Sequence, residues 1–181
     1  MRTDEDAMRR LILLRHAKSD WPPGMVDHDR PLAARGRRAA PLIGRWLVDN
    51  GFVPDRALVS TAERTRETWA LASAGLIAMP AATFEPRIYE APAWQLLNVI
   101  RETSDDVATL LLVGHNTGIE DLAAGLICAG PEDQRRRLAR KYPTGGLAVI
   151  DCAAHSWRDI AAGIGTLHAF VVPRDLDPEA E

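Results

Sequence analysis

The stretch LILLRHAKSDW, residues 11–21, joins a short apolar run to an abrupt change of chemistry. Its first four residues, Leu11 to Leu14, are typical of a strand that is buried on both faces of a parallel sheet. Arg15 and His16 follow directly, so a cation and a titratable ring stand where the strand is expected to end. Because ligands of open α/β sheets bind beyond the carboxyl ends of the strands, this position is a candidate functional site.

Two later segments repeat the order of apolar strand, polar turn and helix. The strand ALVS, residues 57–60, leads into a helical stretch that begins near Arg64. The segment from residue 108 to residue 130 contains LLLVGHN, in which His115 and Asn116 follow the strand and precede a helix. Such alternation predicts a three-layer α/β/α sandwich with a mostly parallel central sheet, and it places all three strand ends on one rim.

Composition limits the wider possibilities. The chain of 181 residues is 46% hydrophobic, which suits a single domain over residues 1–181 with loose tails at about 1–8 and 174–181. A net charge of −3 gives no indication of a nucleic-acid or membrane-surface partner. The apolar run at the N-terminus is too short for a signal peptide or a membrane span. Two distant cysteines without CxxC spacing fit a reducing cytoplasm.

The predicted rim gathers positive charge on a slightly acidic protein. His16 and His115 occupy equivalent strand ends, Arg15 adjoins His16, and Arg64 lies near the start of a helix, where backbone amides attract anions. A tetrahedral phosphate group fits these side chains, because a planar guanidinium can donate two hydrogen bonds to two phosphate oxygens at once. Metal binding is disfavoured, because no HxH or HExxH spacing occurs and arginines beside the imidazoles would repel a divalent cation.

Five motifs in order along the chain carry a resemblance to a known family. They are LRHAKSDW (14–21), DHDRPLAARGRRAA (27–40), VSTAERTRET (59–68), IYEA (88–91) and LLLVGHNTGIEDLA (110–123). Together they resemble the histidine phosphatase superfamily, with its phosphoglycerate-mutase-like fold, and most of all its small SixA-type phosphohistidine phosphatase branch. The resemblance covers about residues 9–172. Ala17 departs from the glycine usual in the wider superfamily, but the SixA-like branch accepts alanine there.

The resemblance implies a role for each matching residue. His16 corresponds to the nucleophile that accepts the phosphoryl group, Arg15 and Arg64 to the phosphate-binding arginines, and His115 to the second histidine of the pocket. Glu90 falls near the position of an acidic residue in larger members, although SixA-like members often lack a dedicated acid. The resemblance implies no metal and no organic cofactor.

The expected reaction follows from these groups. A neutral imidazole with one ring nitrogen fixed as a donor can attack phosphorus with the other. Arg15, Arg64 and a protonated His115 would then neutralise the equatorial oxygens. Water would release inorganic phosphate from the phosphohistidine intermediate. Arg30 and Asn116 are further candidates for contacting the substrate.

The substrate stays open at this point. A phosphorylated protein carrying phosphohistidine is favoured, because its leaving nitrogen needs little help from an acid and short connections predict an open pocket. The alternatives are a phosphatase or mutase acting on a small phosphomonoester, and a non-catalytic phosphoryl-binding module. The turn Asp27 to Asp29 is expected to be solvated rather than metal-binding, and Trp21 could line the pocket.

Overall fold

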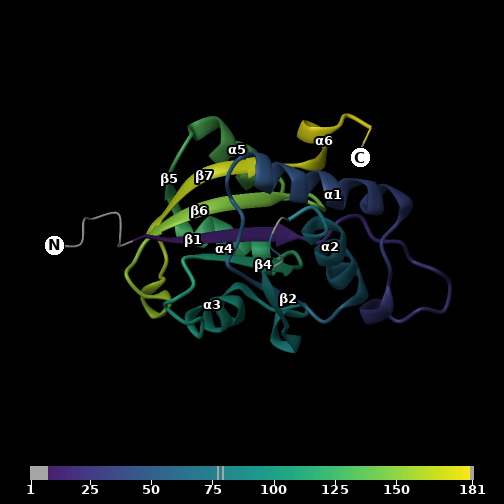
Figure 1. The fold of residues 1–181 in the computed structure, drawn as a ribbon, viewed down its shortest axis with the longest axis horizontal. Helices are drawn as coiled ribbons and strands as arrows, with labels where there is room; N and C mark the ends of the chain where they lie inside the picture. Colours follow the sequence, from purple (N-terminus) through teal and green to yellow (C-terminus); the bar gives the residue numbers. More distant parts are fainter. Residues whose placement is uncertain (1–7, 77, 79, 180–181) are drawn as a thin grey trace.

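A seven-stranded sheet forms the centre of the computed structural model, which describes residues 8–76, 78 and 80–179. The strand order is β3-β2-β4-β1-β6-β7-β5, and helices cover both faces (Figure 1). The strands are β1 (Met8–Arg15), β2 (Arg56–Val59), β3 (Ala81–Phe84), β4 (Thr109–Gly114), β5 (Ile127–Ala129), β6 (Leu147–Ala153) and β7 (Gly165–Val171). The architecture confirms the expected α/β sandwich.

The helices alternate with the strands along most of the chain. The α-helices are α1 (Ala34–Asp49), α2 (Glu63–Ser73), α3 (Ala93–Arg101), α4 (Gly118–Leu126), α5 (Glu132–Arg140) and α6 (Pro173–Leu176). The short 3-10 helices within the described residues are η2 (Asp27–Asp29), η3 (Pro86–Ile88) and η4 (Trp157–Asp159). No helix in the described part of the chain is both long enough and apolar enough to cross a membrane.

The pairing of β1 with its neighbours places the strand ends together. β1 runs parallel to β4, with Arg15 opposite Gly114, and β2 also runs parallel to β4, with Val59 opposite Val113. The carboxyl ends of β1, β2 and β4 therefore lie at one edge of the sheet. On its other side, β1 pairs with the antiparallel strand β6, so the sheet is mixed although parallel pairs prevail.

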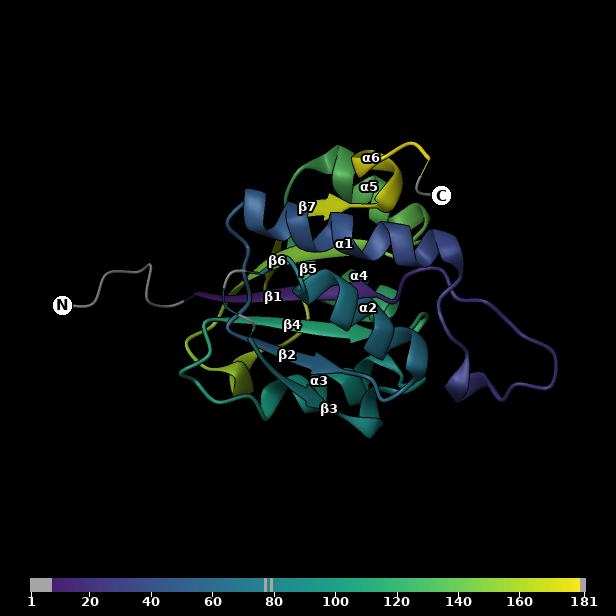
Figure 2. The same cartoon turned by 45° about the vertical axis from the view of Figure 1, so that its right-hand side comes forward.

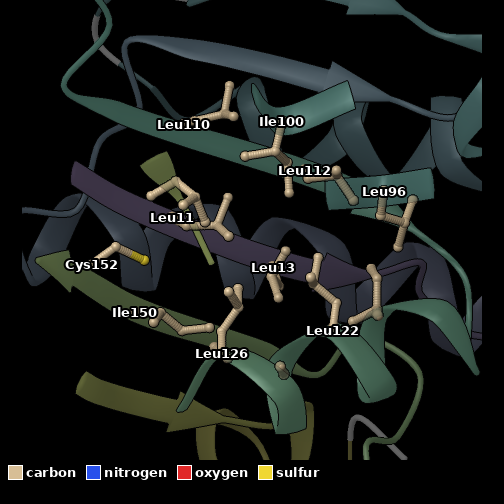
Figure 3. Packing of buried hydrophobic residues seen from close by; sticks show 14 of the residues in the cluster. Leu11, Leu13, Leu96, Ile100, Leu110, Leu112, Leu122, Leu126, Ile150 and Cys152 are labelled. Carbon is tan, nitrogen blue, oxygen red and sulfur yellow. The ribbon is translucent and has the colours of Figure 1, made fainter. Parts of the chain in front are cut away.

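The four apolar residues of β1 divide between the two layers of core. Leu11 and Leu13 face the cluster beneath α3 and α4, where they pack with residues of β4 and β6 (Figure 3). Ile12 and Leu14 face the other cluster, beneath α1 and α2. All four side chains are fully buried. The continuous apolar run thus reflects a strand with both faces covered, as the sequence predicts.

Regular structure reaches the borders of both expected tails. Met8 already pairs with Ala153 as part of β1. Near the other end, Asp175 of α6 accepts a hydrogen bond from Arg137 at 2.7 Å. Residues 1–7 and 180–181 lie outside the described residues.

The connection between β1 and α1 reaches well beyond the edge of the sheet. Figure 2 shows this loop, residues 16–33, extending away from the strand ends before it returns to α1. Its short helix η2 contacts α2. The loop therefore brings residues 27–29 back to the carboxyl ends of the strands.

Candidate active site

Backbone hydrogen bonds fix the segment that carries Arg15 and His16. The amide of Arg15 donates to the carbonyl of Gly146 at 3.0 Å, and the amide of His16 donates to that of Gly114 at 3.0 Å. In return, the amide of Gly145 donates to the carbonyl of His16 at 2.9 Å. The end of β1 is thus bound on one side to the end of β4 and on the other to the segment before β6.

His16 has a defined tautomer. Its Nδ1 lies 2.7 Å from the carbonyl oxygen of Ala17. Because a carbonyl can only accept, Nδ1 carries the proton, and the Nε2 of the neutral ring keeps its lone pair. Burial lowers the pKa of His16 to about 3; the bond to Ala17 opposes this shift, and the nearby His115 and Arg64 add to it. At neutral pH the ring is therefore an uncharged potential nucleophile.

His115 faces His16 across the rim. The two ring centroids are 5.3 Å apart, and the Nε2 of His115 lies 2.8 Å from the hydroxyl oxygen of Ser60. Burial, together with the charge of Arg64, lowers the pKa of His115 to about 3. The ring of His115 is therefore uncharged at neutral pH in the protein itself, and its protonated form during phosphoryl transfer stays a prediction. Its Nδ1 is buried and finds no hydrogen-bond partner among the described residues.

Arg15 is held beside His16 by one backbone carbonyl. Its Nη1 donates to the oxygen of Tyr142 at 2.9 Å. The Nε of the same guanidinium is buried and has no partner among the described residues. Burial lowers the pKa of Arg15, the carboxylate of Glu120 opposes the shift and Arg64 reinforces it. Guanidinium stays protonated in proteins, so Arg15 supplies a positive charge with an unused donor.

Arg64 is the most buried cation of the site. Its side chain projects from the first turn of α2 and is only 4% exposed. Nη1 donates to the backbone oxygen of Asp27 at 2.6 Å, and Nη2 donates to the carboxylate of Asp27 at 3.0 Å. The loop after β1 therefore holds this guanidinium in place before any substrate arrives.

Asp27 belongs to the site, although its sequence context gives no sign of this. Besides Arg64, its carboxylate accepts hydrogen bonds from the hydroxyl of Tyr89 at 2.6 Å and from Nη1 of Arg30 at 3.0 Å. Burial alone would raise the pKa of Asp27, but the bonds from Tyr89, Arg30 and Arg64 lower it below its ordinary value. The interpretation of this turn as merely solvated is wrong for Asp27, which organises three side chains.

The neighbouring residues Tyr89 and His28 extend this arrangement. The ring of Tyr89 lies edge-on to two histidine rings, with its centroid 4.9 Å from that of His28 and 5.5 Å from that of His115. Burial and the bond to Asp27 raise the pKa of Tyr89 to about 12, so its hydroxyl stays protonated as a donor. The Nε2 of His28 lies 3.0 Å from the hydroxyl oxygen of Thr61.

Three other candidates take different positions. The guanidinium of Arg30 donates hydrogen bonds to Asp27, Ser19 and the backbone of Asp20. It therefore stabilises the loop after β1. Its guanidinium also stacks at 3.9 Å on the ring of Trp21, which is 62% exposed and lies on the outside of the loop.

The other two candidates are Asn116 and Glu90. Asn116 adjoins His115, and its Nδ2 donates to the oxygen of Tyr142 at 3.0 Å and to Glu120 at 3.2 Å. Its Oδ1 is buried without a partner among the described residues. Glu90 adjoins Tyr89 but is exposed, and its carboxylate makes no hydrogen bond or ion pair to another described residue. It is not drawn into the network of Asp27.

The chemistry available at this rim is phosphoryl transfer. A neutral imidazole lies beside the two guanidiniums of Arg15 and Arg64, which can stabilise negative oxygens around an attacked phosphorus. Within the described ranges, no three histidine, cysteine, aspartate or glutamate side chains gather as a potential metal site.

Comparison with known proteins points to the same chemistry. Residues 11–95 match the family model of the histidine phosphatase superfamily (branch 1). An uncharacterized protein of Mycobacterium tuberculosis is 42% identical over 163 residues, which span 89% of this chain and 100% of that protein.

Solved structures agree with this assignment. The SixA protein of Agrobacterium tumefaciens is 31% identical and superposes with a TM-score of 0.76, over 91% of this chain and 98% of its own. The SixA protein of Nakamurella multipartitia is 29% identical, with a TM-score of 0.78 over 92% of this chain and 96% of its own. Together with the placement of His16, Arg15, Arg64 and His115, these matches show that the chain belongs to the histidine phosphatase superfamily and is similar to its SixA proteins.

Proposed function

We propose that the protein hydrolyses phosphohistidine on another protein, with His16 as the nucleophile. The observation that carries the proposal is the 2.7 Å contact between Nδ1 of His16 and the carbonyl oxygen of Ala17. That contact directs the lone pair of Nε2 away from its own backbone and leaves it available for phosphorus. A phosphatase of this superfamily needs such a group, and the name of the SixA relatives supports phosphohistidine as the substrate.

The reaction proceeds in two displacements. Nε2 of His16 attacks phosphorus, the phosphorus–nitrogen bond of the substrate breaks, and the protonated substrate imidazole leaves. Arg15 and Arg64 neutralise the oxygens of the transferring group, because their charges lie beside His16 before the reaction begins. Water then attacks phosphorus, and phosphate departs as His16 recovers its lone pair.

The pocket histidine His115 has a role that depends on the substrate. Its ring is uncharged at neutral pH in the protein itself, because burial and Arg64 lower its pKa to about 3. A dianionic phosphoryl group next to the ring would favour its protonated form. His115 would then donate to a phosphoryl oxygen while Ser60 orients the ring through the 2.8 Å contact.

The position of Glu90 favours phosphohistidine over a phosphomonoester. An alkoxide leaving group needs a positioned acid, whereas a protonated imidazole leaves without one. Glu90 is exposed and stands apart from the network of Asp27 and Tyr89. The two free cysteines further support a reducing compartment such as the cytoplasm.

Substrate profiling of the purified enzyme tests the proposal. We expect kcat/KM for a phosphohistidine peptide to exceed that for phosphoserine peptides and small phosphomonoesters by about 100-fold or more. A preference for a small phosphomonoester would overturn the assignment of the substrate and retain the phosphatase. Absence of turnover with every substrate, combined with phosphate binding, would favour a phosphoryl-binding module.

A further inference from the structure

A second feature of the same rim is a groove lined by positive side chains. It has a volume of about 340 Å³ and adjoins the candidate active site through Arg15. Its lining residues are Arg15, Lys18, Arg35, Ala39, Lys141, Pro143, Thr144 and Pro173. Four of these are cations and none is acidic. Lys18 and Lys141 are the only two lysines in the whole sequence, and both lie here.

Among the described residues, three of the four positive charges of the groove, all except Arg15, make no contact that stabilises the fold. The charged groups of Lys18, Arg35 and Lys141 make no hydrogen bond or ion pair with other described residues. All three side chains are exposed. A groove lined by charges of one sign concentrates their field and attracts groups of the opposite sign. On a protein with a net charge of −3, this concentration of positive charge indicates an anionic ligand.

Hydrogen bonds to backbone atoms fix the lining segments of the groove next to His16. The carbonyl of Lys18 accepts from the amide of Ala33 at 2.8 Å, which fixes Lys18 against the start of α1, where Arg35 lies. Lys141 immediately precedes Tyr142, whose carbonyl holds the guanidinium of Arg15. The cations thus come from three separate segments, which these hydrogen bonds hold beside the end of β1.

We infer that this groove binds acidic side chains next to the phosphohistidine of the substrate protein. The inference rests on the proposed function and adds a determinant of specificity to it. A volume of about 340 Å³ is much larger than one phosphate oxygen or water needs, since a water takes about 30 Å³. An extended peptide advances about 3.3–3.6 Å per residue, so residues a few positions from a phosphohistidine at His16 reach the neighbouring groove.

Two peptides and two double variants test the inference. The peptides carry the same phosphohistidine, flanked either by glutamates or by glutamines. For the wild-type enzyme we expect kcat/KM to be about tenfold higher with the glutamate peptide at low ionic strength, because charges at a rim act mainly on association. This ratio should fall towards one in about 1 M salt, where screening is strong.

The groove variant is Lys18→Gln/Lys141→Gln, and its matched control is Arg45→Gln/Arg158→Gln. The control removes the same charge from two exposed side chains that do not line the groove. The groove variant should lose most of the preference for the glutamate peptide, whereas the control should keep it. Thermal unfolding of both variants verifies that each is folded.

The outcomes of these assays distinguish the role of the groove from the proposed function. Hydrolysis of both peptides at the same rate by the wild-type enzyme would overturn the role of the groove but leave the proposed function intact. Failure to hydrolyse either peptide would remove the proposed function itself. An enzyme that ignores the flanking glutamates yet prefers a small bisphosphate to a monophosphate would also overturn the inference, because the groove would then serve a small molecule.

Discussion

The carboxylate of Asp27 lies 3.0 Å from Nη2 of Arg64, although 37 positions separate the two residues in the chain. This pair joins the long loop after β1 to the first turn of α2. The backbone oxygen of Asp27 accepts a second bond from the same guanidinium. Arg64 is thus oriented by an acidic partner, and the substrate meets a cation whose position is already fixed.

Replacing Asp27 should therefore harm both catalysis and stability. In Asp27→Asn we expect kcat/KM to fall about tenfold or more, because Arg64 loses its charged partner. We expect the free energy of unfolding to fall by about 1–3 kcal/mol, because the buried guanidinium is left less well paired. Asp29→Asn is the matched control, since its side chain is 68% exposed and, among the described residues, its carboxylate bonds only to Nδ1 of His28. Equal behaviour of the two variants would contradict the role of Asp27.

The same pair predicts an acid dependence of stability. The folded-state pKa of Asp27 lies below its ordinary value of 3.8. Its ionised form therefore stabilises the fold above that pH, and this contribution is lost as the pH falls below it. Asp27→Asn should flatten the decline of unfolding free energy in that range, as measured by urea titrations.

The two histidines should resist protonation. Their pKa values of about 3 lie far below the ordinary value of 6.5, so both rings should stay neutral at pH 5. Between pH 6.5 and 3 the unfolded chain binds more protons, and the unfolding free energy should decrease as the pH falls. Nitrogen-15 spectra of the rings, compared with those of the urea-unfolded protein, provide the measurement. Titration of both rings near pH 6.5 would show that the site is more open to water than the structure describes.

Glu90 tests the choice of leaving group. If phosphohistidine is the substrate, Glu90→Gln should change its kcat/KM by less than about threefold, because the leaving imidazole needs no positioned acid. Any residual turnover of phosphomonoesters should fall by a larger factor. A loss of about 100-fold on phosphohistidine would instead identify Glu90 as the general acid.

The close approach of α1 to the loop after His16 depends on Gly36. A Cβ at this position would collide with the backbone carbonyl of Lys18. We expect Gly36→Ala to lower the unfolding free energy by about 1–3 kcal/mol. Gly125→Ala, within α4, is the matched control, because no atom lies within 4 Å of its added Cβ. The control should be neutral or stabilising by about 0.5–1 kcal/mol, and denaturant titration of both variants distinguishes them.

The fold was predictable where a short run of residues shows which faces of a strand or helix are buried. The run Leu11 to Leu14 indicated a strand covered on both faces, and the structure buries all four residues. The helix expected after Asn116 ends at Leu126, and the next residues, Ile127–Ala129, form β5 against the distant strand β7. A strand of three residues has too short a pattern to reveal this pairing.

The site was predictable only in part, because some of its contacts join residues that are far apart in the sequence. His16 and Arg15 stand next to each other in sequence, and His115 occupies the equivalent position after β4, so the repeated pattern revealed them. The role of Asp27 depends on partners at positions 64 and 89, which only the folded loop brings near. An aspartate in a polar turn carries no local signal of such contacts.

The most direct test of the account is covalent labelling of His16. Rapid quenching of the enzyme with a radiolabelled phosphohistidine peptide should trap an acid-labile, alkali-stable phosphoryl group on the protein, and peptide mapping should place it on His16. His16→Ala should abolish both the label and turnover, because no other imidazole of the described site has its Nδ1 bound to a carbonyl. The variant should keep its fold. A label that persists at full strength in His16→Ala, or that maps to His115, would contradict the central claim.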